Sequence, residues 1–166
     1  MQIRTATSQD IVKTYKLYDD ARSDLRRRNI FQWPDDYPSE QTVRTDIGRG
    51  ELYVITDNDQ IAGAICLNQR QDEQYKDINW LLDGSKVMVV HRLVVAPHLQ
   101  GRGLAQKLMT FAEQLAADEG YTCIRLDAYT GHARTRQFYE QRGYRIRGEV
   151  FFPQREMPFW CFERNI

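Results

Sequence analysis

Hydrophobic residues recur along this chain with two different periods, which predicts a mixture of helices and strands. Apolar residues three or four places apart, such as Ile11, Tyr15 and Tyr18, predict an amphipathic first helix. The sequence predicts helices that begin after the capping residues Thr7, Ser39 and Thr130 and after Gly103, and that end near Arg28, Gly48, Arg142 and Gly120 respectively. Shorter apolar runs predict strands over residues 2–6, 52–56, 61–67, 87–95, 123–128, 145–152 and 159–163.

The predicted strand from Val87 to Val95 is nearly continuous in apolar character, so we expect it to be buried on both faces of a sheet. Regular alternation of side chains places His91 on the side of Val95 and Arg92 on the opposite side. Elsewhere the polar residues 57–60 predict a hairpin turn, and residues 69–85 predict a polar loop.

The order of predicted elements is β-α-α-β-β-β-α-β-α-β-β, which indicates a mixed α/β fold. A length of 166 residues fits a single domain over residues 1–166. Lysine plus arginine and aspartate plus glutamate number 23 each, so the net charge is zero and predicts no nucleic-acid partner.

Two further features concern the environment of the chain. No apolar run approaches the length of a membrane span, so the sequence predicts a soluble, cytoplasmic protein without a membrane partner. The cysteines Cys66, Cys123 and Cys161 lie in apolar runs without close spacing, so we expect buried free thiols in a reducing compartment.

A short turn that contains glycine follows the strand ending at Val95 and precedes a helical pattern. Such a turn directs backbone N–H groups to the positive end of a helix, where a phosphate or pyrophosphate binds. A Walker loop requires Lys followed by Ser or Thr after its second glycine, but Gly103 is followed by Leu104. A dinucleotide fingerprint requires a small residue three places after Gly103, where this chain has Gln106.

A third phosphate-binding pattern, Gln/Arg-x-x-Gly-x-Gly/Ala, fits this turn without departure, as Gln100-Gly101-Arg102-Gly103-Leu104-Ala105. Here the chain resembles the GNAT superfamily, the GCN5-related N-acetyltransferases. The segment from Phe138 to Tyr144 resembles a second motif of that family. The resemblance covers essentially the whole chain, and it implies the GNAT fold: a central mixed, mostly antiparallel sheet of about six to seven strands with helices on both faces.

The resemblance also implies acetyl-CoA as co-substrate. In the family, the glycine turn holds the pyrophosphate of coenzyme A, and the backbone of the preceding strand pairs with the pantetheine arm and the thioester. The implied cofactor-binding residues are therefore Leu93, Val94, Val95, Gln100, Gly101, Arg102, Gly103, Leu104 and Ala105. His132 is a further implied contact, at a position where many members of the family have Asn.

Acetyl transfer to an amine requires a neutral nucleophile, a donor for the oxyanion and a proton for the departing thiolate. A lysine-like amine has a pKa near ~10.4, so few molecules are neutral at pH 7. His91 occupies the place of the general base in histone-type members; water in that role, with His91 packed in the sheet, is the alternative. Tyr139 matches the family tyrosine near the coenzyme sulfur, and it is the predicted general acid.

The acceptor side is less defined by the sequence. The family covers its acceptor site with the first helices and the loop between them, a region that contains Trp33 and Tyr37 here. These two residues and Trp80 are candidate contacts of a small-molecule or peptide amine. We expect no metal site, because the three histidines lack ligand spacing.

Three functions are compatible with this pattern. The leading hypothesis is an acyl-CoA-dependent N-acetyltransferase in which an amine attacks acetyl-CoA directly. The alternatives are a non-catalytic coenzyme A-binding or sensor module and an O-acyl transferase. Tyr139 favours the enzyme, because a binding module has no need of a proton donor. A homodimer is the default expectation for a small cytoplasmic enzyme.

Overall fold

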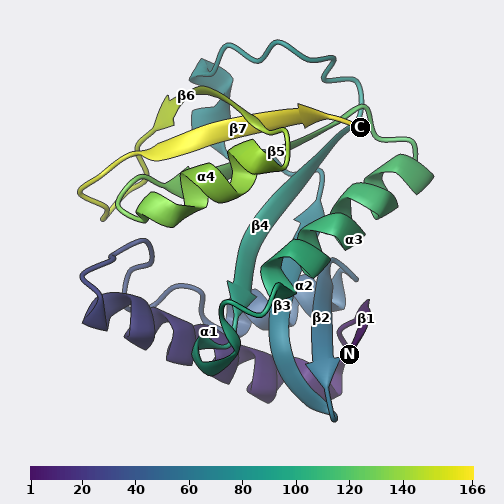
Figure 1. Cartoon of the computed structure of the whole chain (residues 1–166), viewed down its shortest axis with the longest axis vertical. Coiled ribbons are helices and arrows are strands. Elements are labelled where there is room, and N and C mark those ends of the chain that lie inside the picture. Colours follow the sequence, from purple (N-terminus) through teal and green to yellow (C-terminus); the bar gives the residue numbers. More distant parts are fainter. The chain divides into compact units, whose positions relative to one another are not determined.

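The structure is a computed structural model that describes all 166 residues (Figure 1). Its strands are β1 (Gln2–Thr5), β2 (Leu52–Asp57), β3 (Gln60–Asn68), β4 (Val87–Val95), β5 (Cys123–Tyr129), β6 (Arg145–Val150) and β7 (Phe159–Asn165). Its α-helices are α1 (Ile11–Arg27), α2 (Glu40–Gly48), α3 (Leu104–Asp118) and α4 (Ala133–Gln141). Short 3-10 turns span Ser8–Asp10, Glu73–Asp77 and Pro97–Leu99.

The seven strands form one sheet in the order β1-β2-β3-β4-β5-β7-β6. Strands β4 and β5 pair in parallel, whereas β1 with β2, β2 with β3, β5 with β7 and β6 with β7 pair antiparallel. The mixed, mostly antiparallel sheet and the order of elements therefore confirm the predicted fold class.

The chain divides into two compact units that alternate along the sequence. The first unit comprises Met1–Asn29, Asp35–Leu67 and His91–Ala112, and the second comprises Ile30–Pro34, Asn68–Val90 and Glu113–Ile166. Three elements continue from one unit into the other: β4, α3 and, by its last residue, β3.

Local sequence signals explain where the first helical segment and α2 begin. The carboxylate of Asp10 accepts hydrogen bonds from the backbone N–H of Thr7 at 2.7 Å and from Arg4, which fixes the start of the first helical segment. Ser39 Oγ accepts from the N–H of Thr42 at 3.1 Å and caps α2 as predicted. Figure 1 shows α2 behind β2 and β3 and the first half of α3 in front of them.

The second unit packs α4 on the sheet formed by β5, β7 and β6 (Figure 1). Gly120 and Gly143 have φ values of +72° and +86°, and they end α3 and α4 where the sequence predicts. The predicted cap of α4 is wrong: His132, and not Thr130, precedes the helix. Thr130 Oγ1 instead donates to the carbonyl oxygen of Pro158 at 2.8 Å. The hydroxyl of Thr130 is thus used in a contact with the chain segment before β7.

The structure bears on two expectations, the state of the cysteines and the absence of a membrane-spanning helix. Cys66, Cys123 and Cys161 are all buried and unpaired with one another, as the sequence predicts. None of the helices combines the length and the apolar character that crossing a bilayer would require.

Candidate active site

The glycine turn between β4 and α3 begins as a 3-10 turn over Pro97–Leu99. The N–H of Leu99 donates to the carbonyl oxygen of Ala96 at 2.9 Å, which closes this turn. Gly101 and Gly103 follow with φ values of +78° and +77°. Residues with a Cβ rarely adopt this left-handed backbone, so the path of the turn requires glycine at both positions.

The start of α3 supplies a ready anion site. Lys107 is the first residue of the helix whose N–H bonds back, to the carbonyl oxygen of Gly103 at 3.0 Å. The N–H groups of the three residues before it, Leu104, Ala105 and Gln106, therefore have no acceptor within the helix. Together with the helix dipole, these donors favour a negatively charged ligand at this end.

The space above the turn is open in the structure. A methyl group placed on Gly101 would meet no atom within 4 Å, and one on Gly103 would meet only Gln106 Oε1 at 3.7 Å. Glycine is therefore required here by its backbone conformation, and the uncrowded side of Gly103 leaves room for a ligand to approach the amides.

Strand β4 is kinked just before its proposed cofactor-binding residues. Arg92 has a φ of +50°, which interrupts the regular alternation that the sequence predicts for this strand. The Arg92 carbonyl oxygen accepts a hydrogen bond at 2.9 Å from the hydroxyl of Tyr18 on α1. The first half of β4 is buried, but His91, Arg92 and Leu93 are only half-buried, so the expectation of burial on both faces is wrong for this part of the strand.

A close approach to β3 holds the end of β4. An ideal Cβ on Gly63 would lie 2.8 Å from the carbonyl oxygen of Val94, a distance that real Cβ atoms do not reach. The N–H of Ala96 donates to the carbonyl oxygen of Ala62 at 2.9 Å. The backbone of Val94 thus has its position because β3 carries glycine opposite to it.

The side chain of Arg92 is held by three polar groups. Its Nη1 donates to the hydroxyl oxygen of Tyr37 at 2.8 Å, and its Nη2 lies 2.6 Å from Asp46 Oδ2 and 3.2 Å from Cys66 Sγ. Burial raises the pKa of the Cys66 thiol to about 12, so it stays protonated at neutral pH. Tyr37, predicted as an acceptor contact, therefore binds a protein side chain through its hydroxyl.

Potential metal donors also occur in this cluster. One donor atom from each of Asp46, Glu51 and Cys66 lies within 4.8 Å of the others. The guanidinium of Arg92 contacts two of these groups and balances the charge of the Asp46 carboxylate. A metal cation in the same place would be repelled by Arg92, so the arrangement favours an ion pair over a metal centre.

Tyr139 lies on α4 and is buried in the second unit. Its ring contacts the rings of Phe138, Tyr144 and Phe162, with centroids 5.0, 5.8 and 5.4 Å away. Burial raises the pKa of Tyr139, the charge of Asp127 raises it further, and Arg142 opposes the shift. The phenol therefore keeps its proton at any physiological pH and is available as a hydrogen-bond donor.

Comparison with known proteins gives this arrangement a family. The sequence profile of the Acetyltransferase (GNAT) family matches residues 14–144. The chain belongs to that family. The match identifies an N-acetyltransferase rather than a non-catalytic binding module, and the family uses acetyl-CoA as its acyl donor.

Individual relatives agree with this assignment. The acetyltransferase is 26% identical over 127 residues to the uncharacterized N-acetyltransferase YesJ of Bacillus subtilis (strain 168), an alignment that covers 75% of this chain and 70% of the relative. A GNAT family acetyltransferase from Streptococcus agalactiae 2603 has a TM-score of 0.84 at 24% identity, over 99% of this chain and 95% of that chain. The protein yncA of Salmonella typhimurium, solved with its cofactor acetyl-CoA, has a TM-score of 0.74 at 15% identity, over 99% of this chain and 93% of that chain.

The remaining predicted site residues of the acetyltransferase belong to the second unit. His132 is half-buried, and its carbonyl oxygen accepts from Thr135 Oγ1 at 2.8 Å. Trp33 is buried. Trp80 donates through Nε1 to the carbonyl oxygen of Tyr75 at 3.0 Å, and its ring lies against the guanidinium of Arg125, 4.4 Å from it. Trp80 thus has a packing role beside its predicted acceptor role.

The predicted site residues are divided between the two units of the chain. His91, Tyr37 and the proposed cofactor segments at residues 93–95 and 100–105 are all in the first unit, whereas Tyr139 and His132 are in the second. The residues that shape β4 were not predicted from the sequence, namely Tyr18, Asp46, Gly63 and the backbone of Arg92. A glycine within an apolar strand, at Gly63, was a signal of close backbone approach that the sequence did contain.

Proposed function

We propose that this acetyltransferase moves the acetyl group of acetyl-CoA to an amine by direct attack, without a covalent intermediate on the enzyme. The observation that carries the proposal is the turn at Gly101 and Gly103, because its left-handed backbone opens onto the unpaired N–H groups at the start of α3. Residues 100–105 bind the pyrophosphate of the cofactor in this proposal.

The backbone of Leu93, Val94 and Val95 binds the pantetheine arm and donates to the thioester carbonyl. This role is supported by the pairing of β4 with β5, which runs from Val87 to Val90 and stops before the kink at Arg92, since unpaired N–H and C=O groups are available to a ligand. His132 contributes a further hydrogen bond to the cofactor. A donor fixed in the backbone stabilises the oxyanion without reorganisation, which is the usual main term in acyl transfer.

Tyr139 supplies the hydrogen for the departing sulfur. Because burial raises the pKa of Tyr139, complete proton transfer to a thiolate costs more than it would for an exposed tyrosine. Tyr139 therefore acts mainly as a hydrogen-bond donor that stabilises negative charge on the sulfur as the C–S bond breaks, and the proton follows.

The amine loses its proton to His91 or to water. His91 is half-buried in β4, one residue before the kink and two before the first proposed cofactor-binding residue. A neutral imidazole accepts a proton near pH 7, which suits a base for an ammonium acceptor. The acceptor is a small-molecule or peptide amine, and Trp33, Tyr37 and Trp80 are its proposed contacts.

Four general properties complete the proposal. Both units act as one acetyltransferase domain, which is supported by the continuous elements β4 and α3. The enzyme acts in the cytoplasm, which is supported by its three buried cysteines, since none of them forms a disulfide. It works without a metal ion and assembles as a homodimer, the common state of small enzymes.

The decisive experiment measures thiol release from acetyl-CoA with purified enzyme across a panel of amines that includes polyamines, amino acids, aminoglycosides and peptides with free N-termini. At least one amine is expected to accelerate thiol release well above the hydrolysis of acetyl-CoA alone, with a stoichiometric acetylated product by mass spectrometry. Calorimetry with coenzyme A separates binding from turnover. Absence of binding at millimolar coenzyme A would contradict the proposal.

A further inference from the structure

Arg92 connects the kink in β4 to α1, to α2 and to the segment between these two helices. Its carbonyl oxygen accepts from Tyr18 of α1 at 2.9 Å. Its guanidinium binds Asp46 of α2 at 2.6 Å and Tyr37, in the segment between the two helices, at 2.8 Å. Backbone and side chain of one strand residue are therefore both fixed by the α1–α2 region.

We propose that Tyr18, Tyr37, Asp46 and Arg92 form a clamp that sets the kink of β4 and thereby positions the backbone of residues 93–95 for acetyl-CoA. Arg92 is a positioning residue in this scheme, because it acts through its neighbours in the strand. The inference rests on the proposed function, since it concerns the same cofactor-binding strand.

The backbone of Arg92 makes such a clamp necessary. A φ of +50° is unfavourable for a residue with a long side chain, and it persists only where the surroundings hold it in place. Tyr18 supplies one restraint, because its hydroxyl fixes the direction of the Arg92 carbonyl. Without these contacts the strand is expected to relax toward regular β geometry, which would turn the N–H and C=O groups of the next residues.

Charge supplies the second restraint. The side chains of Arg92 and Asp46 are only 12% and 5% exposed, so each is costly to bury without the other. The guanidinium is planar and donates to Asp46 and Tyr37 at the same time, which fixes its orientation as a single ammonium group would not. The ion pair thus holds Arg92 against α2 while Tyr18 holds its carbonyl against α1.

The clamp also links the two substrates. The segment between α1 and α2 is the proposed acceptor cover, and its Tyr37 binds Arg92 directly. An acceptor that shifts Tyr37 therefore changes the support of the strand that binds acetyl-CoA. Binding of a productive amine is expected to tighten the cofactor in the wild-type enzyme, and loss of the clamp is expected to remove this coupling.

The first test is Tyr18→Phe, which removes one hydroxyl from a tyrosine that is 1% exposed. Its matched control is Tyr75→Phe, in the second unit, where a tyrosine that is 2% exposed donates to Asp127 at 2.7 Å. We expect Tyr18→Phe to weaken coenzyme A binding by about 3- to 10-fold in calorimetry, and Tyr75→Phe to leave it within about 2-fold. Amide hydrogen exchange at residues 93–95 is expected to quicken only in Tyr18→Phe.

The second test is Asp46→Asn, compared with Asp10→Asn. Both variants remove the charge of a buried carboxylate in the first unit that pairs with arginine, at 2.6 Å for Asp46 and 2.7 Å for Asp10. Asp46→Asn is expected to raise the KM for acetyl-CoA roughly 10-fold or more with a smaller effect on kcat, whereas Asp10→Asn lowers only thermal stability. The double variant Tyr18→Phe/Asp46→Asn is expected to be non-additive, because both changes act on one residue.

Two results would overturn the clamp. The first is that Tyr18→Phe and Asp46→Asn bind coenzyme A as tightly as their controls, Tyr75→Phe and Asp10→Asn, at matched thermal stability. The other is unchanged exchange at residues 93–95 in folded Tyr18→Phe. Failure of the proposed function has a different signature, because the wild-type protein itself would then not bind coenzyme A.

Discussion

At the scale of single residues, the proposed chemistry depends on how burial changes the side chain of Tyr139. Tyr139 is enclosed by three aromatic rings, and its raised pKa keeps the phenol protonated. We expect Tyr139→Phe to lower kcat by roughly 10- to 10³-fold while the affinity for coenzyme A stays unchanged, because the change removes only the donor to the departing sulfur. Steady-state kinetics with the best amine, beside calorimetry, measure both quantities.

The matched control for this prediction is Tyr144→Phe. The ring of Tyr144 contacts that of Tyr139, and its hydroxyl lies 3.2 Å from Glu113, so the variant removes a neighbouring buried hydroxyl. Its kcat is expected to stay within about 3-fold of the wild type. Equal kcat values in the two variants would remove Tyr139 from the chemistry.

His91 is tested by the pH dependence of the rate. If its imidazole takes the proton of the amine, kcat/KM rises with pH as the imidazole loses its own proton, and His91→Gln removes this limb of the profile. We expect a loss of roughly 10- to 10²-fold at pH 7 that narrows at alkaline pH, where more amine is already neutral. A profile of the same shape in both proteins would leave His91 as a packing residue and water as the base.

At the scale of secondary-structure elements, the start of α3 is the proposed binding site of the cofactor. Gly103→Val is expected to reduce coenzyme A affinity by at least about 10²-fold, because valine strains the left-handed backbone and crowds the amides. Gly120→Val is the matched control: it has nearly the same φ, +72° against +77°, and open space around its Cβ, but it lies beyond the other end of α3. Calorimetry should find near-normal affinity in this control despite a similar loss of stability.

The start of the first helical segment makes stability depend on acid pH. Hydrogen bonds from Arg4 and then from Thr7 lower the pKa of Asp10 from 3.8 to about 2. Because the folded-state pKa is depressed, the stabilisation is complete above about pH 4 and is lost as the pH falls toward 2. Denaturant titrations should find Asp10→Asn less stable than wild type by about 1 kcal/mol at pH 6, a value kept small because solvent screens the partly exposed Arg4. This difference in stability should vanish near pH 2.

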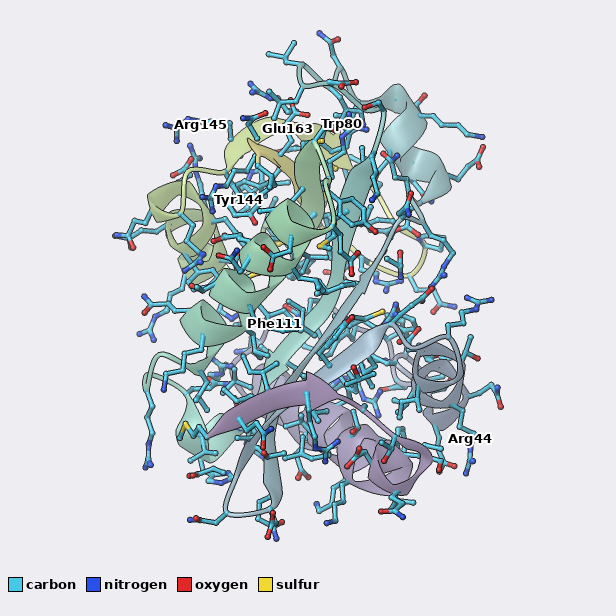
Figure 2. All side chains as sticks on the ribbon, turned by 90° about the vertical axis from the view of Figure 1, so that its right-hand side faces the viewer. Arg44, Trp80, Phe111, Tyr144, Arg145 and Glu163 are labelled. Carbon is cyan, nitrogen blue, oxygen red and sulfur yellow. The ribbon has the colours of Figure 1, made fainter.

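At the scale of the whole molecule, the chain forms two compact units, and the second contains one fully buried carboxylate, that of Glu163. Glu163 on β7 accepts from Arg147 Nε at 2.7 Å and from the N–H of Leu81 at 2.8 Å. Its Oε2 lies 3.7 Å from Arg125 Nε. Figure 2 shows Glu163 beside Trp80, where the loop before β4 reaches β7. This single acid thus joins the long polar loop to the sheet.

We expect Glu163→Gln to lower the free energy of unfolding by roughly 3–5 kcal/mol, because it leaves the two arginines beside it without a buried countercharge. Glu140→Gln removes a comparable carboxylate from an exposed pair with Arg136 at 3.0 Å, and it should cost less than about 0.5 kcal/mol. Denaturant unfolding of both variants measures the difference. A loss below about 1 kcal/mol in Glu163→Gln would show that the loop is held by packing instead.

The sequence by itself determined the element order, the caps at Thr7 and Ser39, and the glycine turn. These features are local: hydrophobic periodicity, a side chain that reaches an amide three residues away, and a backbone conformation open mainly to glycine all act over a few residues. For the same reason the family and the conformation of the glycine turn were predictable from short stretches of chain.

Only the tertiary structure decided the kink at Arg92, the role of Tyr37 and the partners of Glu163. Arg92 has no local signal for a left-handed backbone, because the groups that stabilise it come from residues 46 to 74 positions away in the sequence. The contacts that fix a strained or charged residue are non-local, and one sequence read in order contains no record of which distant groups meet.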